Sequence, residues 1–184
     1  MKVAVLGAGA MGTGIGQIAV QNGCHVVYYD SFPGATDRSK SSIEKIFARL
    51  VEKGKITSEQ KEEMLGRMQW SADVDAVSGA DLVVEAVIED LDVKKDLFAK
   101  VEPLLRSDAW LCTNTSSLSI AALSSGLTHP ERFGGLHFFN PAPLMPLVEV
   151  VPDVKTGDDF TETMEALMLE WGKVPVVAKD TPGF

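Results

Sequence analysis

The feature that most constrains this chain is its first 30 residues, in which a glycine-rich turn separates two apolar segments. Residues 2–6, KVAVL, form a short Val-rich run that is followed by Gly7, and residues 25–30, HVVYYD, form a second run. Between them, apolar residues recur at helical spacing until Asn22-Gly23 supplies a stop. This order predicts a strand, a helix and a second strand, the unit that opens an α/β fold.

The turn has the sequence Gly7-Ala8-Gly9-Ala10-Met11-Gly12, a G-x-G-x-x-G pattern that follows a predicted strand and opens a predicted helix. Gly7 allows the tight turn, Gly9 lets the backbone approach a pyrophosphate, and Gly12 lets helix and strand pack closely. The N–H groups at the helix start then face the phosphates. This context predicts a dinucleotide-binding site.

Asp30 lies at the end of the second predicted strand, eighteen residues after Gly12. A carboxylate at this position accepts hydrogen bonds from the adenosine ribose hydroxyls and repels a 2′-phosphate, so NAD is favoured over NADP. Arg38 and Lys40 weaken this preference slightly, because a nearby cation could hold that phosphate.

Two successive helices are predicted after Asp30, the first at about residues 36–53 and the second from Thr57. They lengthen the crossover beyond what a β–α–β unit needs and form a helical arm at about residues 36–68. Strands and helices then alternate to the end of the chain. The sequence predicts a Rossmann-like, doubly wound, mostly parallel sheet with this arm inserted after the second strand.

The stretch LHFFNPAPLMPLVEVV, residues 136–151, holds two predicted strands with no room between them for a crossover helix. An antiparallel member is therefore predicted among the last strands. Period-two alternation predicts that Phe138 and Phe139 point to opposite faces of the sheet.

Ligands of a doubly wound sheet bind at the carboxyl ends of its strands, so polar residues that follow strands are the candidates for chemistry. They are Glu85, Glu89, Asn114, Thr115, Ser116, Ser117, His137, Asn140 and Glu149. Only His137 among them suits a base near neutral pH for removing a hydroxyl proton. Glu149, across a short connection, is its natural partner for fixing the tautomer, although spacing alone leaves a surface position equally open.

Composition excludes several classes of partner. A net charge of −9 argues against nucleic acid, and no apolar run is long enough to cross a membrane. Cys24 and Cys112 form no CxxC pair, so we expect reduced thiols, no metal site and a cytoplasmic location. The chain starts without the composition of a signal or transit peptide.

The chain resembles the L-3-hydroxyacyl-CoA dehydrogenase family, of which the bacterial 3-hydroxybutyryl-CoA dehydrogenases are the nearest variety. The matching stretches are GAGAMGTGI, DLVVEAVIED, NTSSLSI, GLHFFNPAPLMPLVEVV and KDTPGF, which together span almost the whole chain. The resemblance implies that residues 1–184 are the NAD-binding domain of an oxidoreductase of fatty-acid β-oxidation. The reaction it implies is hydride transfer between NAD and the C3 hydroxyl or ketone of a 3-hydroxyacyl-CoA.

The resemblance also implies a role for individual residues. His137 would be the catalytic base, Glu149 its partner, and Ser116 a hydrogen-bond donor to the 3-oxygen of the substrate. Asn140 would contact both cofactor and substrate. The implied cofactor contacts are Gly7, Gly9, Met11, Gly12, Asp30, Glu89, Lys94, Ser116 and Asn140.

For the helical arm, the resemblance implies contacts to coenzyme A. Lys53 and Lys55 are equally good candidates for a phosphate contact, and Ile46 stands where the family often has a serine. The family continues beyond Phe184 into a helical C-terminal domain, which this chain lacks, and the full-length protein is expected to be a homodimer through that domain. Two alternatives stay open: a related sugar-acid dehydrogenase of the L-gulonate type, and a nucleotide-binding module without catalysis.

Overall fold

The structure is a computed structural model that describes all 184 residues. Its centre is one eight-stranded sheet with the strand order β3-β2-β1-β4-β5-β6-β7-β8. The strands are β1 (Lys2–Leu6), β2 (His25–Tyr29), β3 (Met68–Ser71), β4 (Leu82–Glu85), β5 (Trp110–Thr113), β6 (Phe133–Phe138), β7 (Leu147–Val151) and β8 (Val174–Val177). The order reverses at β1, between β2 and β4, which makes this the doubly wound sheet that the sequence predicted.

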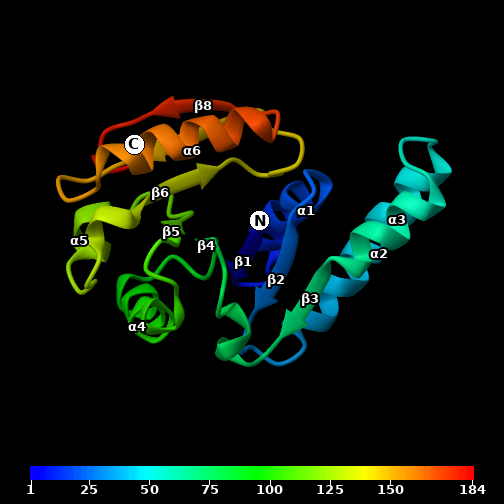
Figure 1. The fold of residues 1–184 in the computed structure, drawn as a ribbon, viewed down its shortest axis with the longest axis horizontal. Helices are drawn as coiled ribbons and strands as arrows, with labels where there is room; N and C mark the ends of the chain where they lie inside the picture. Colours follow the sequence, from blue (N-terminus) through cyan, green and yellow to red (C-terminus); the bar gives the residue numbers. More distant parts are fainter.

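Helices cover both faces of the sheet (Figure 1). The helices are α1 (Ala10–Gln21), α2 (Ala35–Glu52), α3 (Ser58–Gly66), α4 (Leu91–Val101), α5 (Ile120–Ser124) and α6 (Asp158–Glu170), with short 3-10 turns at Val74–Val77, Glu102–Leu104 and Pro130–Arg132. Two separate clusters of buried side chains form the core, one against α1, α2 and α6 and the other against α4 and α5. In β1, Val3 and Val5 belong to the first cluster and Ala4 and Leu6 to the second, as the alternation of a strand requires.

Strands β1 to β6 are parallel, whereas β7 runs antiparallel to β6. The antiparallel member predicted near the end of the sheet is therefore confirmed, and β8, parallel to β7, shares its direction. Phe138 is buried in the core, while the ring of Phe139 lies 4.6 Å from that of His137, centroid to centroid. The two phenylalanines point to opposite faces, as predicted.

Helices α2 and α3 form an arm that extends away from the sheet (Figure 1). Ile43 and Phe47 on α2 are fully buried and attach the arm to the core. The second helix starts with a capping box, in which Thr57 Oγ1 accepts from the Gln60 amide and the Gln60 side chain accepts from the Thr57 amide.

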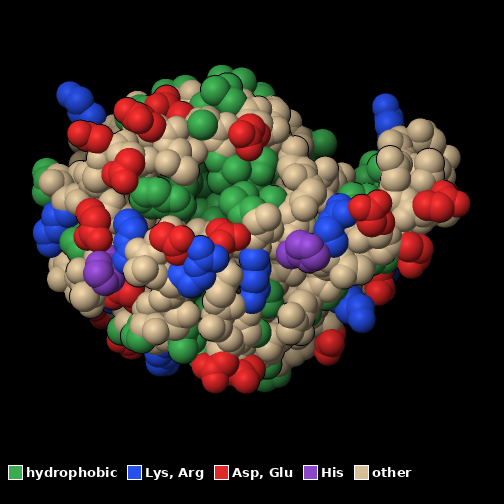
Figure 2. Space-filling model, in the orientation of Figure 1, with side chains coloured by type: hydrophobic (Ala, Val, Ile, Leu, Met, Phe, Trp, Pro, Cys, Tyr) green, Lys and Arg blue, Asp and Glu red, His purple; other side chains and the backbone are tan.

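Acidic and basic side chains are scattered over the visible face of the molecule rather than gathered in one patch, and hydrophobic side chains collect in a hollow at its middle (Figure 2). None of the helices combines the length and the hydropathy that crossing a membrane requires.

Candidate active site at the carboxyl ends of the strands

The glycine turn has the geometry that a pyrophosphate requires. Gly7 has a φ of +102°, and a Cβ placed on it would lie 2.6 Å from the carbonyl oxygen of Ala86. A Cβ on Gly12 would lie 1.9 Å from the carbonyl oxygen of Gly7, so only glycine lets α1 start this close to the turn. A Cβ on Gly9 would meet nothing within 4 Å. The backbone at Gly9 is therefore open to a ligand, and the free N–H groups of the first turn of α1 face it.

Asp30 follows β2 directly and is tied to the same turn. Its Oδ2 accepts a hydrogen bond of 2.8 Å from the Ala8 amide, and its Oδ1 accepts one of 2.8 Å from the Phe32 amide. The carboxylate is half-buried and is held in a fixed orientation beside Gly9. Each oxygen keeps a lone pair for a ribose hydroxyl, since a carboxylate accepts about four hydrogen bonds.

His137 and Glu149 form a pair across the antiparallel strands. They are direct neighbours in the register of β6 and β7, and Nδ1 of His137 lies 2.6 Å from Oε2 of Glu149. The two side chains are only 14 % and 17 % exposed. Partial burial strengthens the attraction and holds both side chains in one geometry. Sequence spacing could not show this contact, because it depends on strand register.

His137, the member of the pair on β6, lines a cavity of about 300 Å³ between β4, β5 and β6. Seven of the residues singled out from the sequence lie on its wall: Met11, Glu89, Lys94, Asn114, Ser116, His137 and Asn140. Ser116 and Asn140 are exposed, and each follows the end of its strand. The structure therefore brings the imidazole, a hydroxyl and an amide together at one end of the sheet.

Glu89 and Lys94 belong to a chain of ionic contacts under this cavity. Lys94 is 1 % exposed, and its Nζ lies 2.6 Å from Glu85 Oε1 and 3.2 Å from Glu89 Oε2. The other oxygen of Glu89 accepts from the Ser116 amide at 2.9 Å and from the Thr115 hydroxyl. Lys94, on the wall of the cavity, therefore supports the loop that carries Ser116, because its ammonium is engaged by two carboxylates.

Glu85, a candidate for chemistry from its place after an apolar strand, instead lies at the centre of this buried network. It is fully buried, and its carboxylate also accepts from the hydroxyl of Thr113 and the amide of Val87, each at 2.6 Å. Burial raises the pKa of the Glu85 carboxyl, while the Lys94 ammonium and the two other donors act against that rise. The signal in the sequence was a carboxylate at the end of an otherwise apolar strand, without a visible partner.

Asn114 lines the same cavity and also supports its frame. Its Oδ1 accepts a 2.8 Å hydrogen bond from the amide of Phe138, directly beside His137. This bond ties the loop after β5 to the end of β6.

A second cavity, of about 650 Å³, lies between α1, the arm and the loop that follows β6. The arm contributes Arg38, Ser42, Ile46 and Leu50 to its wall, and Gly9 joins it to the dinucleotide site. Lys53 and Lys55, both exposed at the far end of α2, are not part of this wall. Arg38 is the basic residue that lines this cleft. Its guanidinium lies 5.8 Å from the centre of the Phe32 ring.

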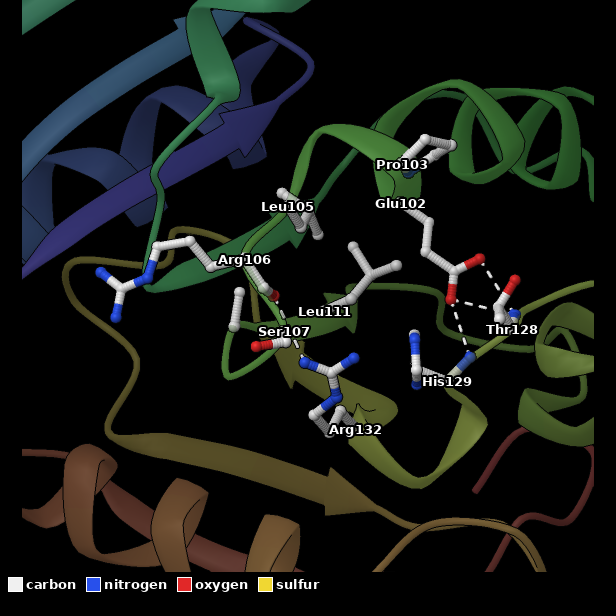
Figure 3. A pocket seen from close by; sticks show the side chains of 10 residues that line it. Glu102, Pro103, Leu105, Arg106, Ser107, Leu111, Thr128, His129 and Arg132 are labelled. Atoms are coloured by element: carbon white, nitrogen blue, oxygen red, sulfur yellow. Dashed lines mark hydrogen bonds between the residues drawn. The ribbon is translucent and has the colours of Figure 1, made fainter.

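A third cavity, of about 320 Å³, lies at the opposite, amino ends of β5 and β6 (Figure 3). Its charged groups are already engaged. The carboxylate of Glu102 accepts from the amides of Thr128 and His129, and Arg106 points away to pair with Asp81 and Asp108. Nothing in this cavity combines a free base with a free donor.

The fold and the site together define a class of protein: a Rossmann-type dinucleotide-binding domain with a histidine–carboxylate pair near the carboxyl ends of the parallel strands. The chain belongs to the family described as "3-hydroxyacyl-CoA dehydrogenase, NAD binding domain", the model of which matches residues 2–181. NAD, the cofactor that Asp30 predicted, is the cofactor of this family's domain.

Individual relatives agree with the family. The chain is 46% identical over 185 residues to the 3-hydroxyadipyl-CoA dehydrogenase of Escherichia coli K12, covering 99% of the chain and 38% of that protein. It superposes with a TM-score of 0.97 on the crystal structure of an E. coli K12 3-hydroxybutyryl-CoA dehydrogenase, at 44% identity, covering all of the chain and 39% of the other. For the (S)-3-hydroxybutyryl-CoA dehydrogenase of Ralstonia eutropha, the TM-score is 0.95 at 34% identity, with coverage of 100% and 65%. The chain thus spans less than two thirds of these relatives.

Proposed function

We propose that this chain carries the cofactor site and the acid–base pair of a 3-hydroxyacyl-CoA dehydrogenase. In the proposed reaction, hydride passes between NAD and C3 of the acyl chain, the carbon that bears the hydroxyl or ketone oxygen. The observation that carries the proposal is the 2.6 Å contact between His137 and Glu149, in which His137 also lines a cavity together with Ser116 and Asn140. The relatives named for 3-hydroxyacyl-CoA substrates support the choice of substrate class.

His137 is proposed to move the proton of the substrate hydroxyl. Because the Glu149 carboxylate accepts at Nδ1, the ring proton stays on Nδ1 and the lone pair of Nε2 is free to take a proton. When Nε2 is protonated, Glu149 stabilises the imidazolium from the other side. In the reverse direction, the same nitrogen returns the proton to the substrate oxygen.

Ser116 is proposed to donate a hydrogen bond to the same substrate oxygen. Its backbone amide is held by Glu89, so the position of the residue does not depend on the ligand. A donor that is fixed in advance stabilises the negative charge that develops on a ketone oxygen during hydride transfer. Asn140 is proposed to contact both the carboxamide end of the cofactor and the substrate.

The residues of the nucleotide end fit NAD. The open backbone at Gly9 and the start of α1 suit a pyrophosphate, and the carboxylate of Asp30 suits an unmodified ribose. When bound, NAD supplies the acceptor for the hydride. Gly7, Gly12 and Met11 shape the turn around it, and Glu89 and Lys94 support the loop beneath the nicotinamide end.

For coenzyme A, we propose the cleft between α1 and the arm. Arg38 and Ser42 provide polar contacts on its wall, and Ile46 and Leu50 provide apolar ones. Lys53 and Lys55 stay candidates only for the outer end of a long ligand, because neither lines the cleft.

Two further expectations stay predictions: a homodimer formed through the helical domain of the family, and a cytoplasmic location. The relatives are longer than this chain, which leaves room for such a domain in the whole protein.

The proposed reaction is tested by following the loss of NADH absorbance with acetoacetyl-CoA in the catalytically active protein, with L-gulonate and NAD as the competing pair. We expect turnover with acetoacetyl-CoA and none with L-gulonate. The opposite preference would assign the chain to a sugar-acid dehydrogenase. Binding of NAD without turnover of either substrate would favour a nucleotide-binding module.

A further inference from the structure

The side chain of Lys173, between α6 and β8, is buried and has an unusual set of partners. Only 7 % of the residue is exposed. Its ammonium donates to the carbonyl oxygen of Ala142 at 2.7 Å and to that of Met145 at 2.9 Å. No carboxylate lies within ion-pair distance of it, whereas Lys94, the other buried lysine, contacts two carboxylates.

This arrangement is costly, because a desolvated ammonium without a counter-ion destabilises the folded chain. Burial accordingly lowers the pKa of the Lys173 ammonium. An apolar side chain of similar length would avoid that cost. The contacts that offset this cost are the hydrogen bonds from the ammonium to the two carbonyl groups.

Both carbonyl groups belong to the loop between β6 and β7. The loop turns on itself, with the amides of Leu144 and Met145 both donating to the carbonyl oxygen of Pro141 at 3.0 Å. On its other side it packs closely on α1, where a Cβ added to Gly14 would lie 3.0 Å from Cδ of Pro143. The loop therefore lies between the Lys173 ammonium on one side and α1 on the other.

The same loop is a wall of two cavities. Asn140 lines the cavity of His137 and also the cleft beside the arm, and Ala142, Pro143 and Leu144 line that cleft. Lys173 lines neither of them. Its position thus affects both ligand sites through the backbone it holds.

We propose that Lys173 is a positioning residue, which holds residues 140–146 as the common wall of the cofactor and acyl-CoA sites. The inference rests on the proposed function for the identity of the ligands. The part that concerns the loop itself is independent of any ligand.

The test uses the 184-residue chain with Lys173→Met, which keeps length and removes both charge and donors. Lys173→Arg retains the charge, and Lys179→Met removes an exposed lysine six residues later. Hydrogen exchange reports on the Leu144 and Met145 amides, with Leu136 in β6 and Val150 in β7 as references. Calorimetry with NADH reports on the site.

In Lys173→Met, the Leu144 and Met145 amides should exchange about tenfold faster or more, while the references keep their rates, because the charge-assisted bonds of the loop are lost. The dissociation constant for NADH should rise by about tenfold. Lys173→Arg should keep exchange rates and NADH affinity close to those of the unmodified chain. Lys179→Met should change neither the exchange rates nor the affinity.

Unchanged exchange at Leu144 and Met145 would overturn the inference, and so would equal acceleration at the reference amides, which would indicate a merely structural role. If Lys173→Met does not fold, Lys173→Gln, which keeps one donor, replaces it under the same criteria. Absence of NADH binding by the unmodified chain would count against the proposed function, while the exchange rates would still decide the inference about the loop.

Discussion

The structure contains two histidine–glutamate pairs, and they lie at opposite ends of the sheet. In the first, His137 and Glu149 face each other across β6 and β7 at 2.6 Å, with side chains 14 % and 17 % exposed. In the second, His129 and Glu131 lie two residues apart in a surface turn, at 3.1 Å, with side chains 50 % and 53 % exposed. Each histidine lines a cavity of similar volume.

The difference between the pairs shows what makes such a pair useful for catalysis. The exposed pair is screened by water and held only by a short turn, so the interaction free energy between its two side chains is small. The half-buried pair is fixed by strand register, and a donor from a neighbouring strand end lies in the same cavity. The chemistry depends on the framework around the pair rather than on the presence of a histidine and a glutamate.

The largest expected effect is that of His137→Gln in the catalytically active protein. Loss of the general base should lower the turnover number by roughly 100- to 10,000-fold, measured as NADH consumption with acetoacetyl-CoA. Cofactor affinity should barely change, because the pyrophosphate and ribose contacts lie at Gly9 and Asp30. The matched change His129→Gln should leave turnover within about twofold. Equal losses in the two variants would abolish the distinction between the pairs.

Glu149→Gln should have the next largest effect. The amide can no longer stabilise the imidazolium, and the loss of one charge-assisted hydrogen bond corresponds to roughly 10- to 150-fold in turnover. The loss should stay below that of His137→Gln, because Glu149 orients the base and carries no proton. Glu131→Gln is the control at the exposed pair. A Glu149→Gln enzyme with full activity would show that the 2.6 Å contact is not used in the reaction.

Asp30→Ser separates cofactor choice from the chemistry of the pair. Removal of the carboxylate should raise the dissociation constant for NAD by about tenfold and narrow the preference over NADP, because the repulsion of a 2′-phosphate is lost. Calorimetric titration of the 184-residue chain with both cofactors measures this. An unmodified chain that binds NAD and NADP equally well would refute the role given to Asp30.

The smallest effects are expected on the arm, where charges are exposed. Arg38→Ala should raise the KM for acetoacetyl-CoA by roughly two- to fivefold, since Arg38 lines the cleft. Lys53→Ala, at the outer end of α2, should have a smaller effect. A larger rise in KM for Lys53→Ala than for Arg38→Ala would indicate that Lys53 or Lys55, and not Arg38, contacts the coenzyme A phosphate.

Most of the fold could be predicted because its signals are local. The strand–turn–helix order around Gly7, the stop at Asn22-Gly23 and the lack of room for a helix between Phe138 and Leu147 each depend on neighbouring residues. Strand β4 ends at Glu85, where the chain turns to form the buried ionic contacts, although the next residues, Ala86, Val87 and Ile88, are also apolar.

The candidate site could be predicted only as far as the sheet itself brings residues together. Carboxyl ends of parallel strands meet at one edge, which is why Ser116, His137 and Asn140 were found. The Glu85–Lys94 contact and the Lys173 contacts join residues that belong to no common motif. No periodicity of the sequence therefore indicates them. The proposed coenzyme A contacts on the arm depend on which helix face meets α1, and Arg38 lines the cleft there whereas Lys53 does not.

The most direct test of the central claim is the tautomer of His137, measured by long-range nitrogen–proton NMR of the 184-residue chain at about pH 9, well above the ordinary pKa of histidine. The account predicts the ring proton on Nδ1, bonded to Glu149, with Nε2 unprotonated and available as the base. His129, which is exposed, should show a mixture of both tautomers. A His137 proton found on Nε2 would contradict the account, because the base would then have no free lone pair toward the cavity.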